Sequence, residues 1–498
     1  MSKNLSSKSI ANNVLANLAG QFIPILVAVI CLPSILAALG VDRLGVLNLA
    51  WVIVGYFSIL DLGLGRSITF FIANKSHSDD EVKLSQIVWL AIFVIGILGA
   101  LVSFIAIITA PILVDRVFAV PDQIRSETLD SFVMLGLSIP LVMVSSGLRG
   151  VLEGFHQFKI INVVRIPVGI FTYASPLLFI HYSNSLVYPV MMIVIARLVN
   201  TLIFFSYARR FLPVCGIKWG SDIKVGLLHL ARFGGWMTIS NVIGPLMTYM
   251  DRFLIGAMLS TAAVAYYSTP YEVVTKLWLI PIALTGVLFP SFAAYQNDVT
   301  KTKRLLEGSI RLVIFGIFPA TFFLVAFSSE ILRLWLGVSF SNASTDVLRW
   351  LAFGVFLNCI AQVYSTFLQS TGRSDMTAKF HIFELLFYVP LVVWLTNNFG
   401  IVGTSWAWVA RVAIDLLLLV LFANSRLLGG VFCAKDMLTL SFLMALMIYF
   451  VLFAIGNYQI LFSAIIITFF IPLFWRYMLK GEEKAMLVSY LLRRSSAK

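Results

Sequence analysis

The stretch LSQIVWLAIFVIGILGALVSFIAIITA, from Leu84 to Ala110, contains no charged residue. About 20 apolar residues in a helix cross the hydrocarbon core of a bilayer, so this stretch is long enough to span a membrane. A surface helix of a water-soluble protein would carry a polar face along one side. We therefore predict a transmembrane helix here and apply the same criterion outward along the chain.

The composition excludes a water-soluble domain. Hydrophobic residues make up 60% of the 498 residues and charged residues only 12%, whereas a soluble domain carries charge on about a quarter of its residues. The net charge of +13 comes from basic residues scattered between apolar runs, without the continuous stripe that indicates nucleic-acid binding. We predict an all-α integral membrane protein that binds no nucleic acid.

Metal and nucleotide sites have no support in the sequence. The cysteines, Cys31, Cys215, Cys359 and Cys433, lie far apart, and the five histidines are equally dispersed, so neither set has the spacing of metal ligands. The chain lacks the GxxxxGK[ST] phosphate loop, and no segment between apolar runs is much longer than about twenty residues, too short for a nucleotide-binding domain. We predict no metal and no cofactor.

Apolar runs that can cross about 30 Å of hydrocarbon recur through the whole chain, roughly fourteen in all. The predicted spans are Val14–Ala38, Leu44–Leu64, Leu84–Ala110, Ser131–Gly150, Ile160–Ile180, Leu186–Ala208, Phe233–Leu259, Tyr266–Phe292, Ile310–Ala326, Val347–Thr371, Ala378–Thr396, Ile401–Phe422, Leu438–Ile455 and Ile460–Met478.

The distribution of Lys and Arg predicts the orientation of these spans. With the N-terminus inside, about 27 of the basic residues fall in cytoplasmic segments and about five fall outside, as expected where positive charge accumulates on the cytoplasmic side. An odd number of spans would have mixed the two sets. We therefore predict a multi-pass protein of a bacterial inner membrane with both termini in the cytoplasm.

An internal duplication with an offset of about 215 residues predicts two lobes. Three pairs support it: Gly20 with Gly235, Leu152 and Glu153 with Leu368 and Gln369, and Ala196 and Arg197 with Ala410 and Arg411. An offset of six spans means that both halves enter the membrane in the same direction. We predict six-helix lobes over residues 1–212 and 213–430, followed by a helix pair and basic tail over residues 431–498.

Ionisable groups at membrane depth are costly unless they face a wet cavity or a partner. In the seventh predicted span, Asn241, Gly244, Thr248 and Asp251 recur at helical spacing and form one polar stripe, with Arg252 beside it. This stripe lines a cavity or holds an ion pair that fixes packing between the lobes.

In the eighth predicted span, Glu272 and Lys276 stand four residues apart with the acid first, the favourable order for a helical ion pair. Such a pair neutralises itself, or it serves binding and gating. In the second span, Asp61 and Arg66 flank Gly63 and Gly65, which permit close backbone approach. This segment is equally consistent with a tight packing turn and with a gate on the cytoplasmic side.

Arg197 and Arg411 occupy corresponding positions in the sixth and twelfth spans, and Asp415 lies one helical turn after Arg411. Their duplication favours a structural role, because a repeat preserves architecture more readily than a single substrate contact.

Several segments resemble the polysaccharide transporter family of the multidrug, oligosaccharidyl-lipid and polysaccharide exporter superfamily, and its O-antigen flippases in particular. They are RFGGWMTISNVIGPLMTYMDRFLIGAMLS (232–260), VAYYSTPYEVVTKLW (264–278), LFPSFAAY (288–295), LDLGLGRSITFFIA (60–73) and GLRGVLEGFHQFKIINVVR (147–165). With the span count, the resemblance covers nearly the whole chain, although the last two spans match by hydropathy alone.

The resemblance implies two six-helix bundles in a V around a central cavity that opens alternately to each side. It implies a cargo of undecaprenyl diphosphate carrying an oligosaccharide repeat unit, and a polysaccharide polymerase and chain-length regulator as partners. Arg66, Arg252 and Lys276 are the candidates to accept the diphosphate, with Asn241 and Thr248 as further cavity residues. Coupling to H+ or Na+, or gating, would fall to Asp61, Asp251 or Glu272.

Two other functions compete with this one. A cation-coupled drug exporter would share the fold, but the basic balance of the intramembrane charges argues against a cationic cargo. A membrane-bound polysaccharide polymerase or ligase would need a long outer loop with catalytic groups. The longest outer segments, 111–130 and 327–346, carry few charges and an amphipathic stretch, SSEILRLWL.

Overall fold

A computed structural model describes residues 7–59, 65, 68–69, 72, 81–155, 157–179, 185–213, 246–295, 297–424, 434–453, 459–479, 481 and 484. All regular structure in these ranges is helical. The chain divides into two compact units, unit 1 over Met1–Ala265 and unit 2 over Tyr266–Lys498. The predicted lobe boundary at residues 212 and 213 adjoins a range outside the described residues, 214–245, and stays a prediction.

In unit 1 the helices are α1 (Ser7–Ile59), α3 (Glu81–Ile112), α4 (Arg125–Gly154), α5 (Phe158–Phe179) and α6 (Val187–Phe211), with short helical turns η1 (Leu113–Val117) and η2 (Asp122–Ile124) between α3 and α4. Residues 246–258 are also helical. Helix α8 (Thr261–Thr275) crosses into unit 2.

Unit 2 continues with η3 (Lys276–Trp278), α9 (Leu279–Ala294), α10 (Val299–Ala326), α11 (Ser328–Leu336), α12 (Val338–Ser370), α13 (Ser374–Phe422), α14 (Ala434–Phe453) and α15 (Gln459–Tyr477). Most predicted spans coincide with one of these helices or with half of one, whereas the eighth, Tyr266–Phe292, is divided between α8, η3 and α9. The second span is described up to residue 59 and the seventh from residue 246 onward. The prediction of an all-α membrane fold is confirmed.

Two helices are hairpins of consecutive spans. Helix α1 reverses at Gly40 (φ 79°) and α13 at Gly400 (φ 59°), backbone conformations that residues with a Cβ rarely adopt. In α13 the two halves are joined near the turn by a hydrogen bond between the buried hydroxyls of Thr396 and Thr404, 2.8 Å long. These reversals connect the first span to the second and the eleventh to the twelfth.

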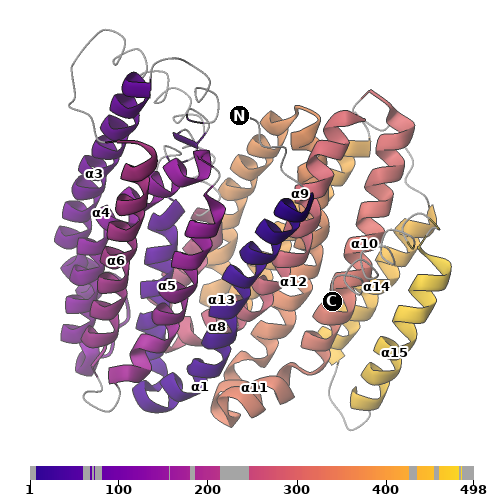
Figure 1. Cartoon of the computed structure of the whole chain (residues 1–498). Coiled ribbons are helices and arrows are strands. Elements are labelled where there is room, and N and C mark those ends of the chain that lie inside the picture. The colour runs from indigo at the N-terminus through magenta and orange to yellow at the C-terminus, as the bar shows by residue number, and fades with distance from the viewer. Residues whose placement is uncertain are drawn as a thin grey trace. The chain divides into compact units, whose positions relative to one another are not determined.

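Each unit is built around one deeply buried helix. In unit 1, α4 packs against α3, α6 and α1, and in unit 2, α12 packs against α13, α10, α11 and α9 (Figure 1). Of their most apolar stretches, 67% of α4 and 78% of α12 are buried, whereas α3, α5 and α6 are buried by a third or less. The outer helices therefore present apolar side chains to the surroundings, as a lipid-exposed surface requires.

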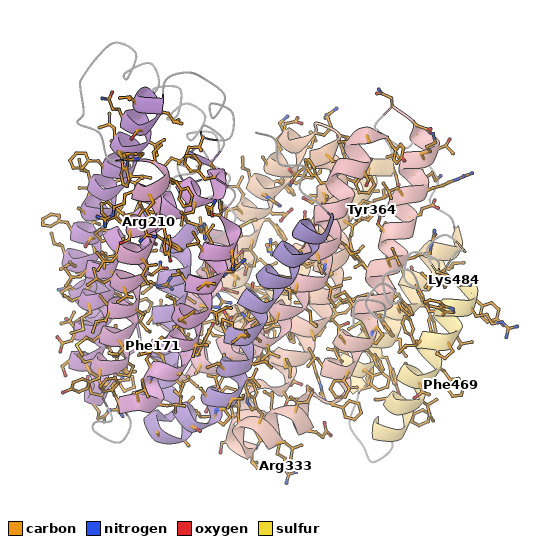
Figure 2. All side chains as sticks on the ribbon, viewed as in Figure 1. Phe171, Arg210, Arg333, Tyr364, Phe469 and Lys484 are labelled. Carbon is orange, nitrogen blue, oxygen red and sulfur yellow. The ribbon has the colours of Figure 1, made fainter. Side chains whose placement is uncertain are left out.

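The surface of the helix bundles is apolar along most of its length. Phe171 and Phe469 are exposed, and Arg333 lies in α11 at one end of unit 2 (Figure 2). Helix α11 is the amphipathic stretch singled out above, with Leu332 and Leu336 buried and Leu334 almost fully exposed. Eight helices of the described residues are long and apolar enough to cross a membrane. The chain is therefore a multi-pass membrane protein.

Candidate functional site: charged groups inside the helix bundles

Of the polar stripe in the seventh span, Thr248 and Asp251 are described, and they lie in unit 1. Asp251 and Arg252 are fully buried, and the Arg252 guanidinium carbon lies 5.3 Å from the centre of the Tyr249 ring. The backbone N–H of Arg252 donates to the Asp251 carboxylate over 2.8 Å. Thr248 is half-buried on the same helix. Arg252 is therefore inaccessible to a ligand in this conformation.

The ion pair predicted in the eighth span is formed. The Lys276 ammonium donates to the Glu272 carboxylate over 2.7 Å, and each side chain is about one-third exposed. The pair lies where the span is interrupted, because α8 ends at Thr275 and the turn η3 separates it from α9. Interrupted helices are common at binding sites within membrane transporters. Both groups are accessible enough to meet a charged ligand.

Three of the predicted site residues, Asp61, Arg66 and Asn241, lie outside the described residues. Gly65, between Asp61 and Arg66, is described and packs so closely on α4 that a Cβ at Gly150 would overlap its carbonyl oxygen. The Thr69 hydroxyl lies 3.0 Å from the Gly150 carbonyl oxygen and 3.1 Å from that of Gly65. Gly65 therefore makes the close backbone approach that was expected of it.

Arg197 and Arg411 each lie beside a tyrosine of the preceding span. Arg197 of α6 is half-buried and interacts electrostatically with Tyr173 of α5. The guanidinium carbon of Arg411 lies 5.6 Å from the ring centre of Tyr388, in the first half of α13. The same pair of residue types thus recurs in both units, about 215 residues apart.

Sequence reasoning missed the acidic partner of Arg411. The Arg411 guanidinium lies 3.6 Å from the carboxylate of Glu384, which is 1% exposed, and Asp415 is also buried. His381, half-buried one turn before Glu384, interacts with Asp415 and Arg411. Glu384 and His381 lie inside the predicted span Ala378–Thr396, so the rule that an ionisable group at membrane depth is a candidate would have selected both.

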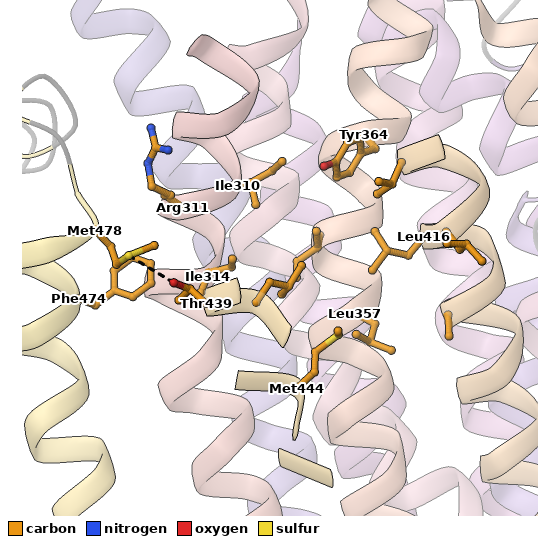
Figure 3. A pocket seen from close by; sticks show the side chains of 15 residues that line it. Ile310, Arg311, Ile314, Leu357, Tyr364, Leu416, Thr439, Met444, Phe474 and Met478 are labelled. Atoms are coloured by element: carbon orange, nitrogen blue, oxygen red, sulfur yellow. Dashed lines mark hydrogen bonds between the residues drawn. The ribbon is translucent and has the colours of Figure 1, made fainter. Parts of the chain in front are cut away.

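A cavity of about 330 Å³ lies within unit 2 between α10, α12, α13, α14 and α15 (Figure 3). Its lining is almost wholly apolar, with Ile314, Leu357 and Leu416 as examples and Arg311 as its one charged member. Arg311 is paired with Glu307 over 3.9 Å. The cavity could not be predicted from a short sequence motif, because its lining residues come from five helices that are separated along the chain. Its surface suits a hydrocarbon chain.

Among the residues described, no three His, Cys, Asp or Glu side chains come together as a metal-binding group. Among the charged groups described above, separate small clusters surround Arg252 in unit 1 and Lys276, Arg311 and Arg411 in unit 2.

Known proteins resemble this chain over most of its length. Residues 10–296 match the family described as polysaccharide biosynthesis protein. A Shigella flexneri protein named "Putative O-antigen transporter" is 30% identical over 411 residues, which are 82% of this chain and 97% of the relative. The lipopolysaccharide biosynthesis protein WzxC of Escherichia coli K12 is 24% identical over 371 residues, 73% of this chain and 70% of that protein.

Solved structures share the fold. The lipid II flippase MurJ, in an inward closed conformation, aligns with a TM-score of 0.70 over 94% of this chain and all of its own, at 16% identity. An inward-facing multidrug resistance MATE transporter aligns with a TM-score of 0.66 over 87% of this chain and 99% of its own, at 13% identity. The chain therefore belongs to the polysaccharide biosynthesis protein family, and it is a membrane transporter and not an enzyme.

Proposed function

We propose that the protein is a flippase that moves a lipid-linked oligosaccharide, carried on undecaprenyl diphosphate, from the cytoplasmic to the outer leaflet. The transport cycle is alternating access of two helical units, driven by an ion gradient. The membrane is the bacterial inner membrane, and both chain termini lie in the cytoplasm. A polysaccharide polymerase and a chain-length regulator act on the product.

The observation that carries this proposal is the match to a protein named as an O-antigen transporter. The match extends along 97% of that protein's length. The fold of a flippase for another lipid-linked sugar supports the same class of cargo. A drug exporter of the superfamily shares the fold at a lower TM-score, and no relative at 24% identity or above named here is a drug exporter.

The geometry of the described residues suits an amphipathic cargo with an anionic head. A diphosphate is excluded by hydrocarbon, so it crosses only where cationic groups offset its desolvation. Lys276 supplies a partly exposed cation at the interruption between α8 and α9. The apolar cavity beside α14 and α15 would hold a segment of the isoprenoid chain.

Complementation of a flippase-deficient strain tests the function. The wild-type chain restores surface polysaccharide, whereas the double variant Arg252→Ala, Lys276→Ala accumulates lipid-linked repeat units on the cytoplasmic leaflet, because the head group loses its cationic contacts. Removal of a charge-assisted contact costs about 1.5–3 kcal/mol, so each loss slows transport by roughly ten- to a hundredfold.

The matched control is Lys301→Ala, which removes an exposed lysine paired with Asp298 outside the spans and leaves surface polysaccharide unchanged. Normal surface polysaccharide in the double variant at normal protein level would exclude Arg252 and Lys276 as the diphosphate site. Single exported units that remain unpolymerised in cells lacking the wild-type protein would contradict flipping itself and indicate a polymerase.

A further inference from the structure

The two halves of α13 enclose a cluster of ionisable groups that the proposed cargo does not use. We name it the α13 cluster: His381, Glu384, Tyr388, Arg411 and Asp415. The carboxyls of Glu384 and Asp415 interact directly with each other, and both interact with Arg411 or lie beside it. Glu384 and Tyr388 are almost fully buried and Asp415 is 7% exposed, so the cluster is screened from bulk water.

The charges of the α13 cluster do not cancel. With the His381 imidazole neutral, two carboxylates face one guanidinium, and with both carboxylates ionised a net negative charge would be buried at membrane depth, at a cost of several kcal/mol. A single proton held between Glu384 and Asp415 removes that excess. Two carboxyls that share one site do so with one proton between them, as in other carboxyl pairs.

The cluster also lacks the hydrogen bonds of a purely structural ion pair. Within the described ranges, both carboxyl oxygens of Glu384 and one of Asp415 accept no hydrogen bond from a donor group, and the Nε atom of Arg411 donates none. The two carboxyls therefore meet each other without other hydrogen-bond donors. The contact between Arg411 and Glu384 spans 3.6 Å, longer than a charge-assisted hydrogen bond of about 2.7–2.9 Å. Buried groups left in this state are characteristic of functional sites.

Unit 1 contains the corresponding pair of spans without the two acidic residues. About 215 residues before Tyr388 and Arg411, the pair Tyr173 and Arg197 recurs in α5 and α6. At the offset that relates these pairs, Gly169 and Thr201 stand where unit 2 has Glu384 and Asp415. An arginine beside a tyrosine is thus sufficient for the packing of two spans, and the carboxyl pair is an addition confined to unit 2.

Building on the function proposed above, we propose that Glu384 and Asp415 together bind and release the proton that couples transport to the proton gradient, with Arg411 as their counter-charge. On the side of higher proton activity, a carboxylate oxygen takes up H+ and forms an O–H bond that donates to the other carboxylate. On release to the other side, the O–H bond breaks and the second carboxylate regains its attraction to Arg411. No other reactant is consumed.

The neighbours of the cluster favour a proton over a metal cation. A guanidinium 3.6 Å from Glu384 repels Na+, whereas protonation of a carboxyl beside Arg411 requires only a shift of that ion pair. From α12, which packs along α13, the buried titratable groups are Arg349, Cys359 and Tyr364. The thiol and the phenol are ordinarily neutral near pH 7, and Arg349 hydrogen-bonds to Ser328 and is paired with Asp346. Tyr271 of α8, which packs on Trp408 of α13, is a further phenol. His381, half-buried at the Ser374 side of Glu384, is positioned to pass the proton to and from Asp415.

Infrared spectroscopy of the full-length protein in lipid nanodiscs tests the site directly, with no cargo present. As the pH is raised, wild type loses the C=O stretch of one protonated buried carboxyl. The variants Glu384→Gln and Asp415→Asn change or abolish this band, and the control Glu153→Gln, which alters a carboxyl paired with Arg149 in unit 1, retains it. An unchanged band in both cluster variants would overturn the proposal.

Transport tests the coupling. Proteoliposomes contain a fluorescent undecaprenyl-diphosphate-linked N-acetylglucosamine probe, and a chemical quencher reports the leaflet that holds it. With wild type, a gradient of one pH unit drives an asymmetry of up to about tenfold, since one coupled proton per cycle is worth about 1.4 kcal/mol. In Glu384→Gln, which is neutral as a protonated carboxyl is, the probe equilibrates between leaflets without responding to the gradient.

The two readouts separate the site from the function. If wild type moves no probe, the proposed function fails, while the infrared titration still decides whether the cluster binds a proton. If Glu384→Gln and Asp415→Asn melt at lower temperature but retain both the wild-type band and its gradient response, the cluster is structural and the proton proposal is wrong.

Discussion

At the residue scale, close backbone contact explains why particular glycines occur inside spans. Gly150 of α4 faces the backbone of Gly65, and the Thr69 hydroxyl lies within hydrogen-bonding distance of carbonyl oxygens of both. Small residues at such crossings let helices approach until backbone atoms meet, and membrane helices depend on this packing because lipid provides no hydrophobic drive for their association.

We therefore expect Gly150→Ala to destabilise the protein by about 1–3 kcal/mol, because its Cβ would overlap the Gly65 carbonyl oxygen. The control Gly96→Ala places its Cβ 3.5 Å from a Val144 methyl carbon, an ordinary contact, and should be neutral or stabilising. Thermal melts in detergent compare the two. Equal melting temperatures for both variants would show that unit 1 does not need this close approach.

At the scale of an element, the start of α10 depends on one acidic side chain. The Asp298 carboxylate accepts the backbone N–H of Lys301 over 3.0 Å and so caps the helix. That hydrogen bond holds the pKa of the Asp298 carboxyl below its ordinary value of 3.8. The cap therefore stabilises α10 at pH values above 3.8 and is lost as the pH falls through the lowered pKa.

The variant Asp298→Ala should increase amide hydrogen exchange in the first turn of α10, Val299–Thr302, whereas Asp298→Asn, which can still cap, stays close to wild type. The difference between Asp298→Ala and wild type should shrink at a pH well below 3.8. Hydrogen exchange followed by mass spectrometry measures both effects. Exchange in Asp298→Ala that matches wild type at neutral pH would mean that packing alone fixes the start of the helix.

At the scale of the whole molecule, the distribution of basic residues predicts the side of the membrane on which each loop lies. Arg304 precedes the predicted span Ile310–Ala326 and Arg333 follows it, and both side chains are exposed. In a cysteine-free background, an impermeant maleimide added to intact cells should label Arg333→Cys and not Arg304→Cys. Labelling of Arg304→Cys alone would invert the topology and with it the predicted location of both termini.

Most of the fold could be predicted from the sequence, because each membrane span is determined by the residues within it. Whether a segment such as Leu84–Ala110 crosses a membrane depends on its own length and apolarity, and the described helices coincide with the predicted spans. The reversals at Gly40 and Gly400 fall within the predicted gaps between spans, residues 39–43 and 397–400. The site was predicted less completely, because a list of charged residues within spans does not say which of them meet.

The sequence by itself determined that the chain is an all-helical membrane protein, where its spans lie and which family it resembles, since hydropathy and motifs are read along the chain. Only the tertiary structure decided that Arg411 pairs with Glu384 across the α13 hairpin, that Arg252 is buried, and that five helices of unit 2 enclose an apolar cavity. Those features depend on how helices rotate and pack against one another, and no single segment encodes that geometry.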